Sequence, residues 1–247
     1  MPDVRSTIEI TKLARELHAD EAELSFLRDS SPEELRALRA ITAAALHARS
    51  ESRVKAWAGL SRALPAPVTA KIAESALGPG LSGRIAGAME PADALRLAEH
   101  FSPGFLARLS VAVDPSRIGP IVAGMPVDLV IDVGRRLLAD HEVVALARFL
   151  GVVDPDVALR LVDGADGADL LQIALYADDR EALDSIVQRL PVERLRALLE
   201  ATGGPDTEAL AAVALDLSPA TRARLAEVVG YLEEPRRGEL LAVLPPA

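Results

Sequence analysis

Three aspartates at intervals of three residues are the side chains in this sequence whose type and spacing could most directly bind a ligand. Asp163, Asp166 and Asp169 are separated by Gly-Ala pairs. Carboxylate oxygens are the ligands that Mg²⁺ and Ca²⁺ prefer, although this spacing differs from that of an EF-hand loop. Two interpretations therefore stay open: a divalent-cation site, or a turn whose aspartates cap a helix that begins near Leu170.

Three arginines recur at intervals of twelve residues, at Arg84, Arg96 and Arg108. A guanidinium binds carboxylates through charge-assisted hydrogen bonds. If alternate arginines share one surface, they could bind an acidic peptide of a partner protein. The alternative is that they pair with Asp and Glu of adjacent helices.

Residues that could carry catalysis are scarce. The sequence has no cysteine, which excludes disulfides, thiolate zinc sites and cysteine nucleophiles. The four histidines (His18, His47, His100 and His141) are scattered, and none forms the i, i+4 pair of a helical zinc site. We therefore predict no catalytic and no cofactor-binding residue, which favours a non-catalytic role.

The elements that position these side chains are marked by regularly spaced prolines at 67, 79, 91, 103 and 115. An apolar residue lies ten positions after each proline, and another lies six positions after four of them: Leu77, Met89, Phe101, Val113, Met125 and Ile85, Leu97, Leu109, Ile121. Proline suits the first turn of a helix and disrupts its interior. The period predicts antiparallel helices of about ten residues, too short to be stable alone, which must pack on their neighbours.

The flanking segments follow a looser pattern. After Pro126 the prolines are less regular, and Asp166 and Asp178 lie near two expected helix starts. Before the repeats, Ser31 and Glu34 form a predicted capping box, and Trp57 is an expected core anchor. We predict two parts: an N-terminal helical segment over residues 1–64 that packs on a repeat region over residues 65–247.

Joints of the "x-Pro" or "Asp-Pro" type chain these helices, as in Glu90-Pro91, Asp114-Pro115, Asp154-Pro155 and Leu190-Pro191. This pattern resembles the N-terminal cytosolic domain of MgtE-type magnesium transporters over roughly residues 64–199. The resemblance implies an all-α fold, a right-handed superhelical α-solenoid of short antiparallel helices. It transfers no metal-binding residue.

Charge narrows the classes of partner. The net charge is −10, and because residues 1–64 carry ten basic and ten acidic side chains, the whole excess lies in residues 65–247. A negative surface repels phosphate, which argues against nucleic acid and anionic lipid as partners.

The sequence contains no run of about 18 apolar residues, so we expect no membrane insertion. The N-terminus lacks an apolar signal region, so we expect a cytoplasmic location.

These observations predict a non-catalytic helical-repeat protein that mediates protein–protein interaction or assembly. The identity of the partner and the oligomeric state stay open. One alternative is a domain that senses a ligand or a divalent cation. A second alternative is a small-molecule-binding protein or an enzyme that uses a groove of the solenoid.

Overall fold

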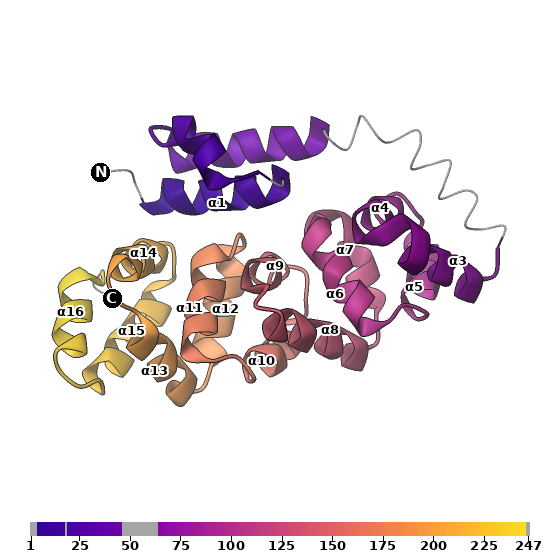
Figure 1. Cartoon of the computed structure of the whole chain (residues 1–247). Helices are drawn as coiled ribbons and strands as arrows, with labels where there is room; N and C mark the ends of the chain where they lie inside the picture. Colours follow the sequence, from indigo (N-terminus) through magenta and orange to yellow (C-terminus); the bar gives the residue numbers. More distant parts are fainter. Residues whose placement is uncertain (1–3, 18, 46–63, 246–247) are drawn as a thin grey trace. The chain divides into compact units, whose positions relative to one another are not determined.

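Every regular element that the structure describes is a helix (Figure 1). The computed structural model describes residues 4–17, 19–45 and 64–245, and it contains no strand in these ranges. Within them, no helix is both long enough and apolar enough to cross a bilayer. The predicted all-α class is therefore confirmed.

The helices are short. One helix without a label covers residues 32–45. Two labelled elements are not α-helices: η1 (Glu21–Leu27) is a 3₁₀-helix and η2 (Ala73–Leu77) is a π-helix. The labelled elements are α1 (Val4–Leu17), η1 (Glu21–Leu27), α3 (Ala66–Ile72), η2 (Ala73–Leu77), α4 (Gly78–Ala86), α5 (Pro91–Ala98), α6 (Pro103–Ala112), α7 (Pro115–Gly124), α8 (Val127–Ala139), α9 (Val143–Arg148), α10 (Pro155–Val162), α11 (Gly167–Tyr176), α12 (Arg180–Arg189), α13 (Val192–Ala201), α14 (Pro205–Ala214), α15 (Pro219–Gly230) and α16 (Arg236–Val243).

The prolines start helices as the period predicts. Pro91, Pro103 and Pro115 are the first residues of α5, α6 and α7, and Pro67 and Pro79 are the second residues of α3 and α4. The exception is Pro120, which lies inside α7. There it removes the backbone N–H that would otherwise bond four residues back.

Polar caps in front of the prolines complete several of these starts. The Asp114 and Asp154 carboxylates accept hydrogen bonds from the second residue of α7 and of α10, and the Ser102 hydroxyl accepts one from Phe105 in α6. The predicted capping box is also confirmed, because Ser31 N donates to Glu34 Oε2 at 2.9 Å and Glu34 N donates to Ser31 Oγ at 3.3 Å. Hydrogen bonds from Ser31 lower the pKa of Glu34.

Helices two positions apart along the chain pack against each other. Packing of this kind joins α3 to α5, α4 to α6, α5 to α7, α6 to α8, α10 to α12, α11 to α13, α13 to α15 and α14 to α16. A helix of about ten residues is marginal in water, so its stability depends on burying one face on such neighbours.

The contacts divide the chain into two compact units, which differ from the division at residue 64 that the sequence suggests. Unit 1 comprises residues 1–35 and 146–247, and unit 2 comprises residues 36–145. Unit 1 carries 14 basic and 27 acidic side chains, whereas unit 2 carries 13 basic and 10 acidic ones. The acidic excess of the chain therefore belongs to unit 1 alone.

In unit 1, α1 binds to the C-terminal helices through an unusually polar face. α1 contacts α11 and α14, and its buried side chains include Glu9 and Lys12 beside Leu13. Lys12 Nζ donates to Glu9 Oε1 at 3.3 Å and to Asp178 Oδ1 at 2.8 Å. A second ion pair joins Glu16 to Arg148 at 3.2 Å. Charged groups thus fix the N-terminal helix to a part of the chain that is distant in sequence.

α11 and α13 approach closely at a glycine. A Cβ atom built on Gly167 would overlap the backbone carbonyl of Ala197. Since a backbone atom cannot move aside as a flexible side chain can, only glycine allows this helix separation.

We predict that Gly167→Ala lowers the free energy of unfolding by about 1–3 kcal/mol, because it forces α11 away from α13. Gly80→Ala is the matched control, since a Cβ at Gly80 meets no atom within 4 Å. Chemical denaturation should show equal or higher stability for the control. Equal stability of Gly167→Ala and the wild type would show that the close approach is not required.

We also predict that Lys12→Ala lowers the free energy of unfolding by about 3 kcal/mol, because it removes the buried ammonium that bonds to both Glu9 and Asp178. Arg196→Ala removes the exposed ion pair with Glu200 and should cost much less than Lys12→Ala, because solvent screens an exposed pair. Denaturant titration monitored by circular dichroism measures both variants. Similar losses for the two variants would contradict the role assigned to Lys12.

Candidate functional site

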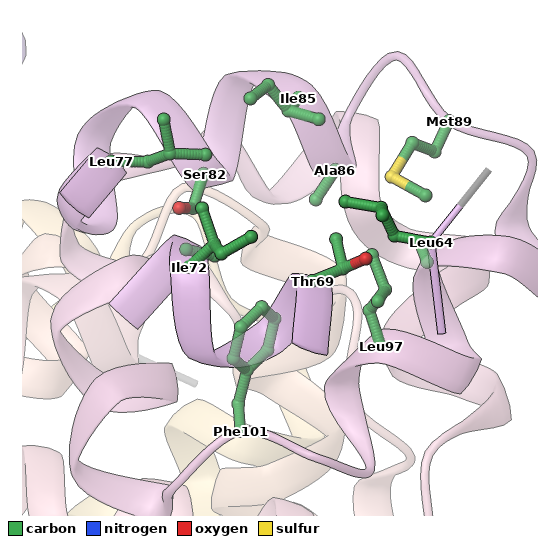
Figure 2. A pocket seen from close by; sticks show the side chains of 12 residues that line it. Leu64, Thr69, Ile72, Leu77, Ser82, Ile85, Ala86, Met89, Leu97 and Phe101 are labelled. Carbon is green, nitrogen blue, oxygen red and sulfur yellow. The ribbon is translucent and has the colours of Figure 1, made fainter. Parts of the chain in front are cut away.

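An apolar cavity in unit 2 is the first candidate site. It has a volume of about 270 Å³, and Figure 2 shows Ala86 and Met89 on one side with Phe101 directed toward them from the other. Its walls come from Leu64, which precedes α3, from α3, η2, α4 and α5, and from the loops that follow α4 and α5. The lining residues are Leu64, Thr69, Ile72, Ala73, Leu77, Ser82, Ile85, Ala86, Met89, Ala94, Leu97 and Phe101.

The proline period supplies five of the twelve residues that line the cavity. Leu77, Met89 and Phe101 are apolar residues ten positions after successive prolines, and Ile85 and Leu97 lie six positions after two of them. The Phe101 ring also packs on Phe105, with ring centroids 4.9 Å apart. The sequence predicts these positions as packed core, whereas the structure leaves a cavity between them.

Two hydroxyls stand on this apolar wall, and only one of them is bonded to the described chain. The Thr69 hydroxyl donates to the Pro65 carbonyl at 3.3 Å. Ser82 is 6% exposed, and its Oγ has no hydrogen-bond partner among the described residues. The Oγ atom is itself enclosed by protein, so it does not face the open space of the cavity.

The three predicted partner-binding arginines, Arg84, Arg96 and Arg108, are all exposed. Two of them lie on helices that pack together, and the third lies on another helix. Arg84 lies on α4 and Arg108 on α6, and these two helices pack together. Arg96 lies on α5, where it donates to Asp93 at 2.5 Å within the same helix. The Arg108 guanidinium lies 5.9 Å from the centre of the Phe105 ring. Helix packing therefore brings together the helices that carry Arg84 and Arg108, whereas Arg96 lies on a different helix.

The three aspartates occupy the joint between α10 and α11. Asp163 is the C-terminal cap residue of α10, and Asp166 is the N-terminal cap of α11. The Asp166 carboxylate accepts a hydrogen bond from Asp169 N at 2.8 Å. Across residues 4–17, 19–45 and 64–245, no three His, Cys, Asp or Glu side chains are grouped so as to hold a metal ion.

The other residues that the sequence singles out are dispersed. His100 and His141 are exposed, on different loops. His18, His47 and Trp57 lie outside the described residues.

Tyr176 and Asp184 are among the ionisable groups of unit 1 whose pKa values are shifted. Burial raises the pKa of the Tyr176 hydroxyl on α11. Burial would also raise the pKa of Asp184, but hydrogen bonds from Thr221, Ser218 and Gln188 lower it overall. Asp184 accepts a hydrogen bond from the backbone N of Ser218, the N-terminal cap of α15, and so links α12 to the start of α15.

Sequence patterns alone do not identify Ser82 as a residue that lines the cavity. It lies on a glycine-rich stretch, Gly78-Pro79-Gly80-Leu81-Ser82-Gly83, which lacks the lysine of a phosphate-binding loop. The signal available in the sequence is its position, three residues before the apolar Ile85 on one helix face.

Comparison of this chain with protein-family models, with curated proteins and with solved structures returned no match.

We predict that Asp166→Ala lowers the free energy of unfolding by about 1 kcal/mol, because α11 loses its N-terminal cap. Asp163→Ala should change it by less than about 0.5 kcal/mol, since Asp163 is exposed at the C-terminal end of α10, where a negative charge is unfavourable. Thermal and chemical unfolding measure both variants. Equal losses would contradict this assignment and would favour a role shared by the carboxylates.

Proposed function

We propose that the protein is a non-catalytic helical-repeat protein that binds an acidic segment of another protein on unit 2. The observation that carries this proposal is the exposure of Arg84 and Arg108 on two helices that pack together, α4 and α6.

The charge distribution supports an acidic partner. Unit 2 has an excess of three basic side chains, whereas unit 1 has an excess of thirteen acidic ones. The excess of unit 2 comes from residues 46–63, and its described residues carry nine basic and nine acidic side chains, so an acidic segment is repelled by unit 1 but not by these residues of unit 2.

A third exposed arginine lies on the helix that packs against α6 on its other side in the chain order. We call the exposed side chains of Arg84, Arg108 and Arg135 the arginine surface. α8 packs on α6 in turn, and it exposes Arg135. Neither Arg84 nor Arg135 forms an ion pair within the described part of the chain. Arginine forms bidentate hydrogen bonds with carboxylates, so such side chains suit the recognition of Asp and Glu.

The packing of helices two positions apart supports a further step. We infer that the helices continue one repeat as a superhelical solenoid, as the resemblance to the MgtE-type N-terminal domain implies. Solenoids use extended surfaces to bind other proteins.

A charge-reversal experiment tests the binding surface. We predict that a Glu-rich peptide binds the whole chain and that Arg84→Glu with Arg108→Glu weakens this binding by about tenfold, since each exposed pair contributes up to about 1 kcal/mol. Calorimetric titration at low and high ionic strength measures the affinity, which should fall as salt screens the charges.

Arg96→Glu is the matched control, because Arg96 lies on α5 and already pairs with Asp93. It should weaken peptide binding less than the double variant does. The proposal is wrong if all three reversals act equally, if the peptide does not bind, or if a polynucleotide binds unit 2 more tightly than the acidic peptide.

A further inference from the structure

We propose that the arginine surface of one molecule binds residues 20–34 of a second copy of this chain. This inference rests on the proposed function and names its partner, since residues 20–34 belong to unit 1 of the other molecule. The two surfaces that meet are different, so the contact is heterologous rather than self-complementary.

Residues 20–34 carry six acidic side chains and one basic one. All six acidic side chains are exposed: Asp20, Glu21, Glu23, Asp29, Glu33 and Glu34. Three of them form local caps, because Asp20 and Glu23 make the capping box of η1 and Glu34 bonds to Ser31. The other three (Glu21, Asp29 and Glu33) form no ion pair with any residue in the described part of the chain. Their charges are therefore available to cations of another molecule.

Phe26 gives the same segment an apolar contact. It is 75% exposed, although phenylalanine is among the residues most often buried. Side chains three residues apart share one face of a 3₁₀-helix, so Glu23 and Phe26 lie on the same face of η1. A guanidinium opposite this face can bond to a carboxylate and lie over the aromatic ring.

The arginines of unit 2 lie beside the contact between two packed helices. A Cβ atom on Gly83 of α4 would lie 3.7 Å from Leu109 Cγ of α6. Arg84 and Arg108 are the sequence neighbours of these two residues, and both are exposed. Two cations therefore lie at the edge of one helix–helix contact, where a single acidic segment can reach both.

Exposed apolar side chains accompany both arginines. Leu81 precedes Arg84 by three residues on α4, and Val111 follows Arg108 by three residues on α6. Residues three apart on a helix are surface neighbours, and Leu81 and Val111 are 37% and 38% exposed. The arginine surface thus presents cations next to apolar groups, which complements the carboxylates and the phenyl ring of residues 20–34.

The overall charge limits the strength of this association. Two copies with a net charge of −10 repel each other at long range. At about 0.1 M salt this repulsion is screened beyond about 10 Å, whereas ion pairs act within about 4 Å. A segment of fifteen residues is smaller than the about 20–30 residues a side of a standard interface, so we expect weak association.

Sedimentation velocity of the whole chain over a range of concentrations measures the association. The mass of the wild type should rise with concentration at about 0.1 M salt, and it should stay monomeric at about 1 M salt, where charges are screened within about 3 Å. The arginine variant carries Arg84→Glu and Arg108→Glu, and the acid variant carries Asp29→Lys and Glu33→Lys. Each should weaken association about tenfold.

A mixture of the two variants tests whether these surfaces bind each other. The acid variant keeps its arginine surface, and the arginine variant keeps its acidic residues 20–34, so an equimolar mixture retains one wild-type contact. The mixture should form a complex of one copy of each, at concentrations where neither variant associates alone. Circular dichroism checks that both variants keep their helices, and Arg84→Glu and Asp29→Lys replace them as single reversals if one does not.

Two matched controls separate the contact from general effects. The two reversals of the acid variant raise the net charge by four, from −10 to −6, which by itself favours association. Asp163→Lys with Glu181→Lys makes the same change elsewhere on unit 1 and should not weaken association. Phe26→Ala should weaken it about threefold, whereas Leu215→Ala, at a side chain of unit 1 that is 59% exposed, should leave it unchanged.

Three results would overturn the inference: a monomeric wild type up to roughly 1 mM protein, undiminished association of the arginine variant, or no complex in the mixture. The Glu-rich peptide separates this failure from that of the proposed function. Peptide binding that depends on Arg84 and Arg108 in a chain that stays monomeric would overturn this inference alone. Absence of peptide binding would overturn the proposed function.

Discussion

The fold depends on one constraint, which is that no helix in the described part of the chain is long enough to be stable by itself. Most span six to fourteen residues, a length at which an isolated helix is marginal in water. Each helix must therefore bury a face on another helix, and the helix two positions along the chain provides that surface. The small residues at close approaches follow from the same constraint, since α11 and α13 meet where Gly167 lacks a Cβ.

Short helices also have many ends, and each end leaves backbone groups to satisfy. Side chains from distant helices satisfy several of them. Glu74 accepts from Ser102 N at the start of α6, and Asp184 accepts from Ser218 N at the start of α15. Arg194 and Arg224 donate to pairs of carbonyls at the ends of α10 and α12. A guanidinium reaches two carbonyls at once, whereas an ammonium presents a single charged centre. This use fits a sequence with 24 arginines and three lysines.

Local features of the fold could be predicted from the sequence, because their causes are local. Proline fixes φ and lacks an N–H, so Pro91, Pro103 and Pro115 mark helix starts. Asp166 is a cap because its carboxylate accepts a hydrogen bond from a backbone N–H in the first turn of α11. Long-range features could not be predicted in this way. Lys12 and Asp178 are 166 positions apart, and no periodicity links them. The cavity depends on how completely regularly spaced apolar side chains fill the space between helices, which spacing does not determine.

Native-state hydrogen exchange tests this account most directly, because it measures the stability of each helix separately. If each helix depends on the one two positions away, the amides of α11 and α13 should become exposed at the same denaturant concentration and with the same free energy. The amides of α4 and α6 should behave in the same way within unit 2. Independent exchange of these helices, each at its own free energy, would contradict the central claim.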